Sequence, residues 1–194
     1  MRLSLLLAMA ALAIPSAAWA DRHDGLLLRV TPGIAGAGAT ADVDDRDASI
    51  RGAAGRLGVT AGWAVVPRVI LTVELLGHAV LGPDLEVDGD VTETDDDVSW
   101  GVSYAGLGVD FYTRNNFHIA GSGGPLIMTL DSDEIDRAET DVGGGGKLAA
   151  GYEWWAGPEV GLGVTLELLA GAVPDGDTTW GVGTLGLAFS ATYN

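Results

Sequence analysis

The most distinctive ligand-type pattern in this sequence is an acidic stretch at residues 84–97. Carboxylates at alternating positions around a glycine can wrap Ca²⁺, as they do in the EF-hand loop. Five acids of the stretch stand close to positions 1, 3, 5, 7 and 12 of such a loop: Asp84, Glu86, Asp88, Asp90 and Asp95. The last of them is the short Asp, and strands, not helices, are expected on both sides. We therefore expect weak binding of Ca²⁺ or Mg²⁺, and a solvated acidic loop without metal is the alternative.

A second set of charged residues lies inside otherwise apolar segments. Both signs are present, and the residues share strand faces with glycine and threonine. The set is Arg29, Arg56, Glu74, Asp110, Lys147, Glu153 and Glu167. Charges are costly on a lipid-facing surface but can pair inside a small barrel. We predict that these seven residues form a salt-bridge network in a barrel lumen.

The sequence offers little for nucleophilic catalysis. There is no cysteine, so thiolates and disulfides are excluded. His118 and Ser122 share a strand face but lie four residues apart, which is too far for contact along an extended strand. His78 has no serine two residues away. We expect a protein without enzymatic activity and without a cofactor, and a lipid-modifying membrane enzyme remains the weaker alternative.

The sequence combines a high negative charge with an apolar composition, and the distribution of the charges along the chain explains this combination. The formal net charge is −17, yet the mean hydropathy is +0.27. Of the 27 acidic residues, 20 fall within four stretches: 42–47, 84–97, 131–141 and 174–177. The segments between them are therefore nearly uncharged and apolar. An acidity of this kind argues against nucleic acid as a partner, because phosphates would be repelled.

The first twenty residues have the pattern of a secretory signal peptide. Arg2 precedes a short apolar run, and Ala18-Trp19-Ala20 forms a cleavage site. We expect residues 1–20 to be a signal peptide and residues 21–194 to form one domain. After residue 20, no uncharged run has the composition and length of a membrane-spanning helix.

The elements that must position these residues are eight apolar segments of strand length. Long or acidic connections alternate with tight ones at 66–68, 113–116 and 156–159. The seventh segment shows the two faces best, with Val160, Leu162, Val164, Leu166 and Leu168 opposite glycine, threonine and glutamate. This pattern predicts an all-β fold, an eight-stranded antiparallel up-and-down transmembrane β-barrel. A soluble β-sandwich or a lipocalin-like barrel is the alternative.

Aromatic residues favour lipid on the outside of that barrel, because they gather near the short turns, where a membrane girdle would lie. Members of this expected girdle are Trp63, Phe111, Tyr112, Phe117, Tyr152, Trp154, Trp155, Phe189 and Tyr193. Trp100 and Trp180 are expected to form a second, sparser belt. The alternation changes phase near Ala105, which indicates a bulge, and Gly121–Pro125 indicates a kink or bulge in the fifth segment.

From Gly25 to Tyr193 the chain resembles the small eight-stranded outer-membrane barrels of the OmpA transmembrane domain, OmpX and OmpW kind. The last segment carries the family's assembly pattern, alternating apolar residues that end in an aromatic, here Leu185, Leu187, Phe189 and Tyr193. Asn194 follows that aromatic and departs from the pattern. The resemblance implies a location in the bacterial outer membrane, with short turns in the periplasm and long loops outside.

The sequence supports two functional readings of such a barrel. The first is a monomer that presents acidic loops and has an envelope-structural or surface-interaction role, with the lipid bilayer and lipopolysaccharide as partners and an extracellular partner unknown. The second, implied by the OmpW resemblance, is a narrow transport barrel for small apolar solutes. A filled lumen would favour the first reading, and an opening near Gly123–Pro125 the second.

Overall fold

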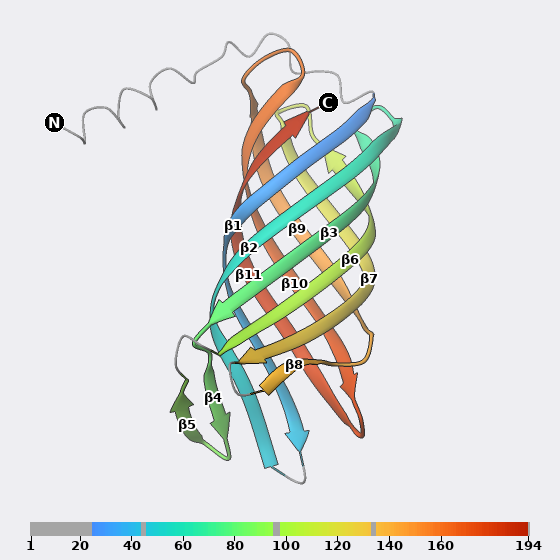
Figure 1. The fold of residues 1–194 in the computed structure, drawn as a ribbon. Coiled ribbons are helices and arrows are strands. Elements are labelled where there is room, and N and C mark those ends of the chain that lie inside the picture. The colour runs from blue at the N-terminus through green and yellow to red at the C-terminus, as the bar shows by residue number, and fades with distance from the viewer. Residues whose placement is uncertain (1–24, 44–45, 95–97, 133–134, 194) are drawn as a thin grey trace, which may run out of the picture.

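The computed structural model describes residues 25–43, 46–94, 98–132 and 135–193. The signal peptide predicted at residues 1–20 lies outside these ranges. Eight long strands make up most of the described chain (Figure 1): β1 (Leu26–Val43), β2 (Arg46–Val66), β3 (Val69–Leu81), β6 (Ser99–Tyr112), β7 (Phe117–Ser132), β9 (Gly143–Trp155), β10 (Val160–Asp175) and β11 (Thr178–Tyr193). Within these residues, no helix is long and apolar enough to cross a membrane.

The eight long strands close into one antiparallel barrel. Each pairs with its neighbour in the chain, and β1 pairs with both β2 and β11, so the first and last strands meet. Leu28 stands opposite Tyr193 where the barrel closes. Closure satisfies the backbone hydrogen bonds that an open edge would leave exposed to lipid. The predicted all-β, eight-stranded antiparallel barrel is thus confirmed.

The short turns lie together at the end where the last strand finishes (Figure 1). Strands end and restart on either side of 113–116 and 156–159, as the sequence indicates. Arg68 (φ 71°) and Asn116 (φ 60°) adopt the left-handed conformation in the tight turns. Each turn lets a strand reverse within a few residues, which keeps neighbouring strands in register.

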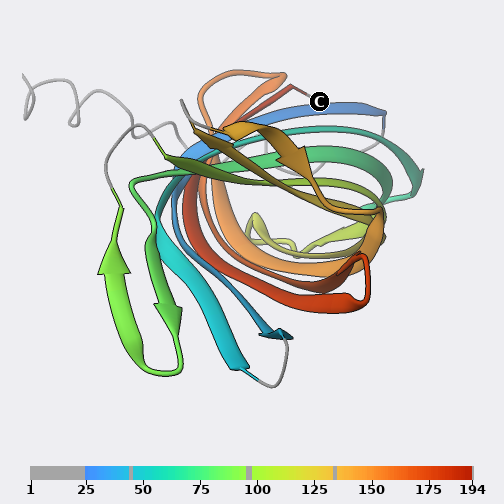
Figure 2. The same cartoon turned by 60° about the horizontal axis from the view of Figure 1, so that its bottom comes forward.

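The acidic connections at the opposite end differ from simple loops. The first, at 42–47, is mostly strand, because β1 and β2 continue to pair as far as Val43 and Arg46. Part of the second folds into a β-hairpin of β4 (Asp84–Val87) and β5 (Asp90–Glu93), and β4 pairs with β2. In the third, β8 (Ile135–Glu139) pairs with β7. Figure 2 shows that the β4–β5 hairpin projects sideways from the barrel.

The bulge predicted near Ala105 is wrong. β6 pairs with β3 in one register from Val69–Phe111 to Leu81–Ser99. Trp100, Val102 and Tyr104 are buried in the lumen, so what changes along β6 is the chemistry of the two faces. The inner face is apolar toward the acidic end and becomes small and polar further along.

Two prolines interrupt single ladders without shifting them. β6 and β7 pair up to Tyr104–Leu126 and resume at Leu107–Gly123, so the gap beside Pro125 preserves the register. A similar gap separates β1 from β11 beside Pro32. Proline lacks the amide donor that a ladder needs, which accounts for both gaps. The kink or bulge predicted at Gly121–Pro125 is therefore a local loss of pairing.

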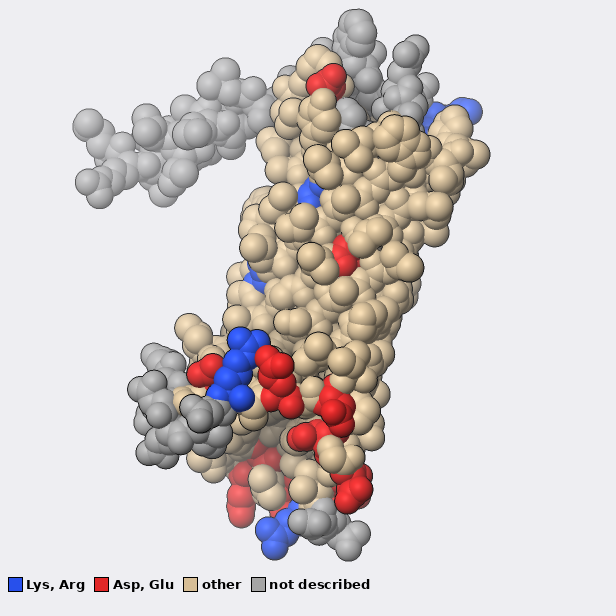
Figure 3. Space-filling model, turned by 45° about the vertical axis from the view of Figure 1, so that its right-hand side comes forward, with Lys and Arg blue, Asp and Glu red and all other residues tan. Residues whose placement is uncertain are grey.

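The outer surface of the barrel has two zones. Nearer the short turns, outward positions carry large apolar residues, such as Leu162, Leu166 and Leu168 on β10. Nearer the acidic end, each of the eight strands carries small outward residues: Gly36, Ala53, Gly55, Gly77, Ala79, Ser103, Gly123, Gly144, Gly146, Ala170, Ala172, Gly181 and Gly183. Figure 3 shows a largely uncharged wall, with acidic side chains gathered at its lower end. A membrane barrel presents to lipid an apolar wall of this kind, bordered by a charged rim.

Candidate functional site

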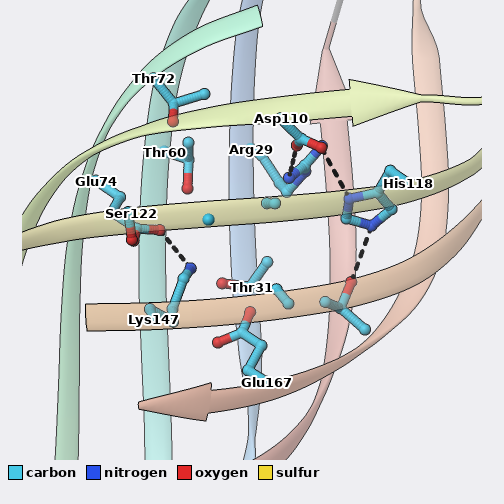
Figure 4. Close-up of a pocket in the computed structure, with 14 residues that line it drawn as sticks. Arg29, Thr31, Thr60, Thr72, Glu74, Asp110, His118, Ser122, Lys147 and Glu167 are labelled. Carbon is cyan, nitrogen blue, oxygen red and sulfur yellow. Dashed lines mark hydrogen bonds and ion pairs between the residues drawn. The ribbon is translucent and has the colours of Figure 1, made fainter. Parts of the chain in front are cut away.

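The lumen is filled by three layers of side chains. Next to the short turns, Leu27, Ile70 and Tyr112 form a small apolar layer. A polar layer follows in the middle of the barrel (Figure 4). Toward the acidic end lies an apolar cluster with Trp100, Leu126, Met128 and Leu169 among its members. An eight-stranded barrel is narrow enough for side chains to fill in this way.

Arg29, on β1, is the centre of one half of the polar layer. Its Nη1 lies 2.7 Å from Asp110 Oδ2, and its Nε lies 3.2 Å from Glu153 Oε1. The guanidinium also contacts the hydroxyl of Tyr112, which donates to Glu153 Oε2 at 3.0 Å. His118 completes the group, with Nδ1 3.2 Å from Asp110 Oδ1 and its ring stacked on Tyr112. A buried cation is thus held by two carboxylates that have further partners, an arrangement that offsets desolvation.

Two further ion pairs occupy the other half of the layer. Lys147 on β9 contacts Glu74 on β3, and Ser122 on β7 donates to the same carboxylate. Tyr104 donates to Ser122 Oγ at 3.0 Å. Arg56 on β2 and Glu167 on β10 are 2.8 Å apart. These pairs join strands that are not neighbours in the barrel and therefore brace its wall.

Glycines make room for this network. A Cβ at Gly151 would lie 2.3 Å from His118 Nε2 and 2.6 Å from Thr165 Oγ1. A Cβ at Gly58 would lie 2.4 Å from Thr31 Oγ1. These positions face the lumen, so the absent side chain leaves space that the polar groups occupy.

The layer leaves almost no free volume. The cavity among its side chains measures about 20 Å³ and is bordered by Arg29, Glu74, Asp110, His118 and Lys147. A water molecule needs about 10–15 Å³ by this measure, so the space suits about one water. At this level the lumen is filled by side chains.

The structure brings all seven predicted lumenal charges into this layer and buries each of them: Arg29, Arg56, Glu74, Asp110, Lys147, Glu153 and Glu167. Sequence reasoning missed Tyr112, which it assigned to the girdle, and it did not foresee that His118 contacts Asp110. Tyr112 is fully buried and does not face lipid. The alternation along β6 contained the signal, because Tyr112 is two residues from Asp110 and so shares its face.

The predicted second aromatic belt is also wrong. Trp100 is buried in the lumen, and Trp180 is half-buried against the apolar cluster there. Of the expected girdle near the short turns, Trp63, Phe111, Phe117 and Tyr152 do face outward, and so do Phe189 and Tyr193. The aromatic girdle is therefore one-sided among the described residues.

The predicted calcium ligands do not form a wrapping loop. Asp84, Glu86 and Asp90 lie on the two strands of the β4–β5 hairpin, and Asp88 begins its turn (φ 52°). Glu86 contacts Arg51, and the Asp88 carboxylate lies 3.9 Å from Arg46. Asp95 lies outside the described residues. No group of three or more potential metal ligands occurs among the residues that the structure describes, so the cation site stays a prediction without geometric support.

The serine and histidine considered for catalysis are not paired. Ser122 donates to Glu74, and His118 contacts Asp110 and, at 3.4 Å, Thr165. His78 lies 3.3 Å from Thr184 Oγ1. In the described residues, both histidines therefore act as lumenal polar side chains, and neither of them is hydrogen-bonded to Ser122.

A larger cavity lies at the acidic end of the barrel, above the apolar cluster. Its volume is about 190 Å³. Trp100, Met128 and Ile50 at its base are buried, whereas Glu139 and Asp175 at its rim are exposed. The cavity is thus closed at the lumenal side and open at the rim.

Comparison with known proteins identifies the fold. No protein-family model matches the sequence, and neither does any curated protein. Among solved structures, the Neisserial surface protein A aligns with a TM-score of 0.59 and 11% identity, over 88% of this chain and 97% of that chain. OprG, an outer membrane protein from Pseudomonas aeruginosa, aligns with a TM-score of 0.51 and 13% identity, over the same shares of the two chains.

These likenesses concern the fold, since the identities are low. Both cover nearly the whole of the other chain, so the match is to a complete barrel. Together with the apolar outer wall and the closed ladder, they define a small eight-stranded β-barrel of the bacterial outer membrane.

Proposed function

We propose that this protein is a non-enzymatic, monomeric outer-membrane barrel that displays an acidic surface to the cell exterior and does not conduct solutes. The observation that carries the proposal is the filled lumen. An apolar layer, a paired polar layer and an apolar cluster succeed one another along its length. The role that remains is to anchor and present the acidic end, a surface-interaction or envelope-structural function beside lipopolysaccharide.

The orientation follows from the ends of the barrel. Short turns lie at one end, and the extended hairpins with most described acids lie at the other (Figures 1 and 3). Barrels of this class keep short turns in the periplasm and longer segments outside. The acidic end then faces the medium, where divalent cations can relieve its repulsion with anionic lipid.

Conductance across a planar bilayer tests the closed lumen. The refolded barrel should give no conductance above that of an empty bilayer, because about one water fits in the central layer. Stable single-channel steps in pure protein would overturn this part of the proposal. A larger open barrel inserted in the same bilayers serves as the positive control.

Cysteine labelling tests the orientation against a cysteine-free background. Asp88→Cys, in the β4–β5 turn, should react with a membrane-impermeant maleimide in intact cells. Asn115→Cys, in the short turn at 113–116, should react only after the outer membrane is permeabilised. The reverse pattern would show that the acidic end faces the periplasm.

One observation favours passage of small apolar solutes as a second candidate. An outer groove of about 510 Å³ beside Pro125 is bordered by outward residues and also by Leu76 and Tyr104, which are buried residues of the lumenal face. The groove lies where the β6–β7 ladder is interrupted. Pro125→Val restores an amide donor there. If this seam admits solutes, cells with the variant should take up a radiolabelled aromatic hydrocarbon more slowly than cells with the wild type. Under the first proposal, both should match cells that lack the protein.

A further inference from the structure

We propose that the 190 Å³ cavity at the acidic end is a binding site for small hydrophobic amines. The inference deepens the proposed surface role and rests on it for access from the medium. The cavity combines an apolar body with an acidic rim. A ligand that matches both parts has one apolar ring and a protonated amino group.

The walls of the cavity supply the apolar part. Trp100 from β6 and Trp180 from β11 line it, together with Ile50, Leu85 and Met128. All except Leu85 and Trp180 are buried, and these two pack against the same apolar cluster. Apolar walls with few polar groups are typical of sites for small ligands.

The rim supplies the charge. Among the described residues, Glu139, at the end of β8, and Asp175, at the end of β10, are the charged residues of the lining, which contains no lysine or arginine there. Glu139 is partly balanced by the exposed Arg137, whose Nε is 2.9 Å from Glu139 Oε1. Asp175 makes no ion pair within the described part of the chain. The surrounding end of the barrel is strongly acidic (Figure 3), which raises the local concentration of cations.

The volume sets the size of the ligand. A closed apolar cavity of about 150 Å³ holds benzene, so 190 Å³ accommodates one ring and a short chain. The amino group then lies at the rim, beside the carboxylates. Below the cavity, the apolar cluster and the polar layer block further passage. The cavity therefore opens only at the rim, so a bound ligand stays there and does not pass through the barrel.

Three probes of matched size separate the apolar and charged contributions. They are phenethylamine, propylbenzene, which replaces the amino group by a methyl, and phenylacetate, which carries the opposite charge. Calorimetry on the purified barrel in lipid nanodiscs, with empty nanodiscs subtracted, should give the order phenethylamine, propylbenzene, phenylacetate from tightest to weakest. The preference for the amine should shrink as salt is raised, because exposed charges are screened.

Substitutions at the rim and wall locate the binding. Asp175→Asn and Glu139→Gln should each weaken the binding of phenethylamine by about threefold, which is the range expected for exposed ion pairs. Neither substitution should change the affinity for propylbenzene. Asp177→Asn is the matched control, since it lies in the same turn but outside the lining. Ala138→Trp fills the cavity from β8 and should abolish binding of both probes.

The proposal fails if phenethylamine binds no better than phenylacetate, if Ala138→Trp binds as the wild type does, or if Asp177→Asn matches Asp175→Asn. A shift in gel migration on boiling shows that each variant is folded before it is compared. Because binding is measured on purified protein, its outcome is separate from conductance and labelling. If phenethylamine does not bind, the proposal of a closed surface barrel still stands. If the cysteine labelling is inverted, the binding site still stands but faces the periplasm.

Discussion

At the scale of single residues, the polar layer is held by a few groups that each satisfy several partners. Arg29 contacts two carboxylates and two hydroxyls, from Thr192 and Tyr112. Removal of such a cation leaves buried negative charges without compensation, which costs more than loss of an exposed pair. The layer therefore closes the lumen and also stabilises the barrel.

Arg29→Met should lower the free energy of unfolding by about 3–5 kcal/mol, because Asp110 and Glu153 lose their shared cation in a buried site. Urea unfolding in lipid vesicles, followed by tryptophan fluorescence, measures the change. Arg137→Met removes an exposed arginine, 61% accessible, from its pair with Glu139. It should cost less than about 1 kcal/mol. Equal losses in the two variants would contradict a structural role for the network.

Lys147 and Glu74 should show strong coupling. Lys147→Met alone leaves the Glu74 carboxylate buried without its cation, at a cost of about 3–5 kcal/mol. Combined with Glu74→Leu, it removes both charges, and the double variant should be more stable than Lys147→Met. A double-mutant cycle on unfolding free energies measures this coupling. Strict additivity would show that the two groups act independently.

At the scale of elements, the strands carry different chemistry at their two ends and on their two faces. β9 illustrates this: Gly144 faces outward near the acidic end, and Gly151 faces the polar layer. The inward glycine is required by a close approach of side chains from β7 and β10. The outward glycine has open space beside it.

Gly151→Ala should destabilise the barrel by about 1–3 kcal/mol, because its Cβ would lie 2.3 Å from His118 Nε2 and 2.7 Å from the carbonyl of Val164. Gly144→Ala is the control on the same strand, where a Cβ meets nothing within 4 Å. It should leave stability unchanged or raise it slightly. The same vesicle unfolding assay applies. A larger loss at Gly144 would mean that the lumenal packing is not the constraint.

At the scale of the whole molecule, the two zones of the outer wall indicate where the bilayer lies. On β10, large outward residues run from Val160 to Leu168, and small ones follow at Ala170 and Ala172. Nine residues approach the length of a tilted membrane-spanning strand. The zone of large residues is thus about long enough to cross the hydrocarbon core of the membrane. The zone of small residues then lies near the outer boundary of that core.

Arginine substitutions on β10 test this placement. Val164→Arg, at the middle of the zone of large residues, should cost about 2–4 kcal/mol, whereas Ala172→Arg should cost at most about 1 kcal/mol. Both side chains point outward, so burial in the lumen does not complicate the comparison. Unfolding free energies in vesicles of one lipid composition give the two values. Equal costs would place the small-residue zone inside the hydrocarbon core.

The sequence by itself determined the strand count, the short turns and the sharing of faces. It did so because a strand alternates its side chains with a period of two, and because charged residues are excluded from lipid. The seven lumenal charges could be selected on this basis. Their partners could not, since Arg29 and Asp110 are 81 residues apart and meet only through strand register and closure.

Only the tertiary structure decided what each face encounters. Trp100, Val102 and Tyr104 alternate as a lipid-facing strand would, yet they fill the lumen, because periodicity groups residues without saying which side is inside. The β4–β5 hairpin likewise follows from pairing with β2, in a stretch whose acidic composition indicates a loop. The cavity at the rim is lined by residues from seven of the eleven strands, together with Thr140 just beyond β8. Such a site exists only once the barrel has closed.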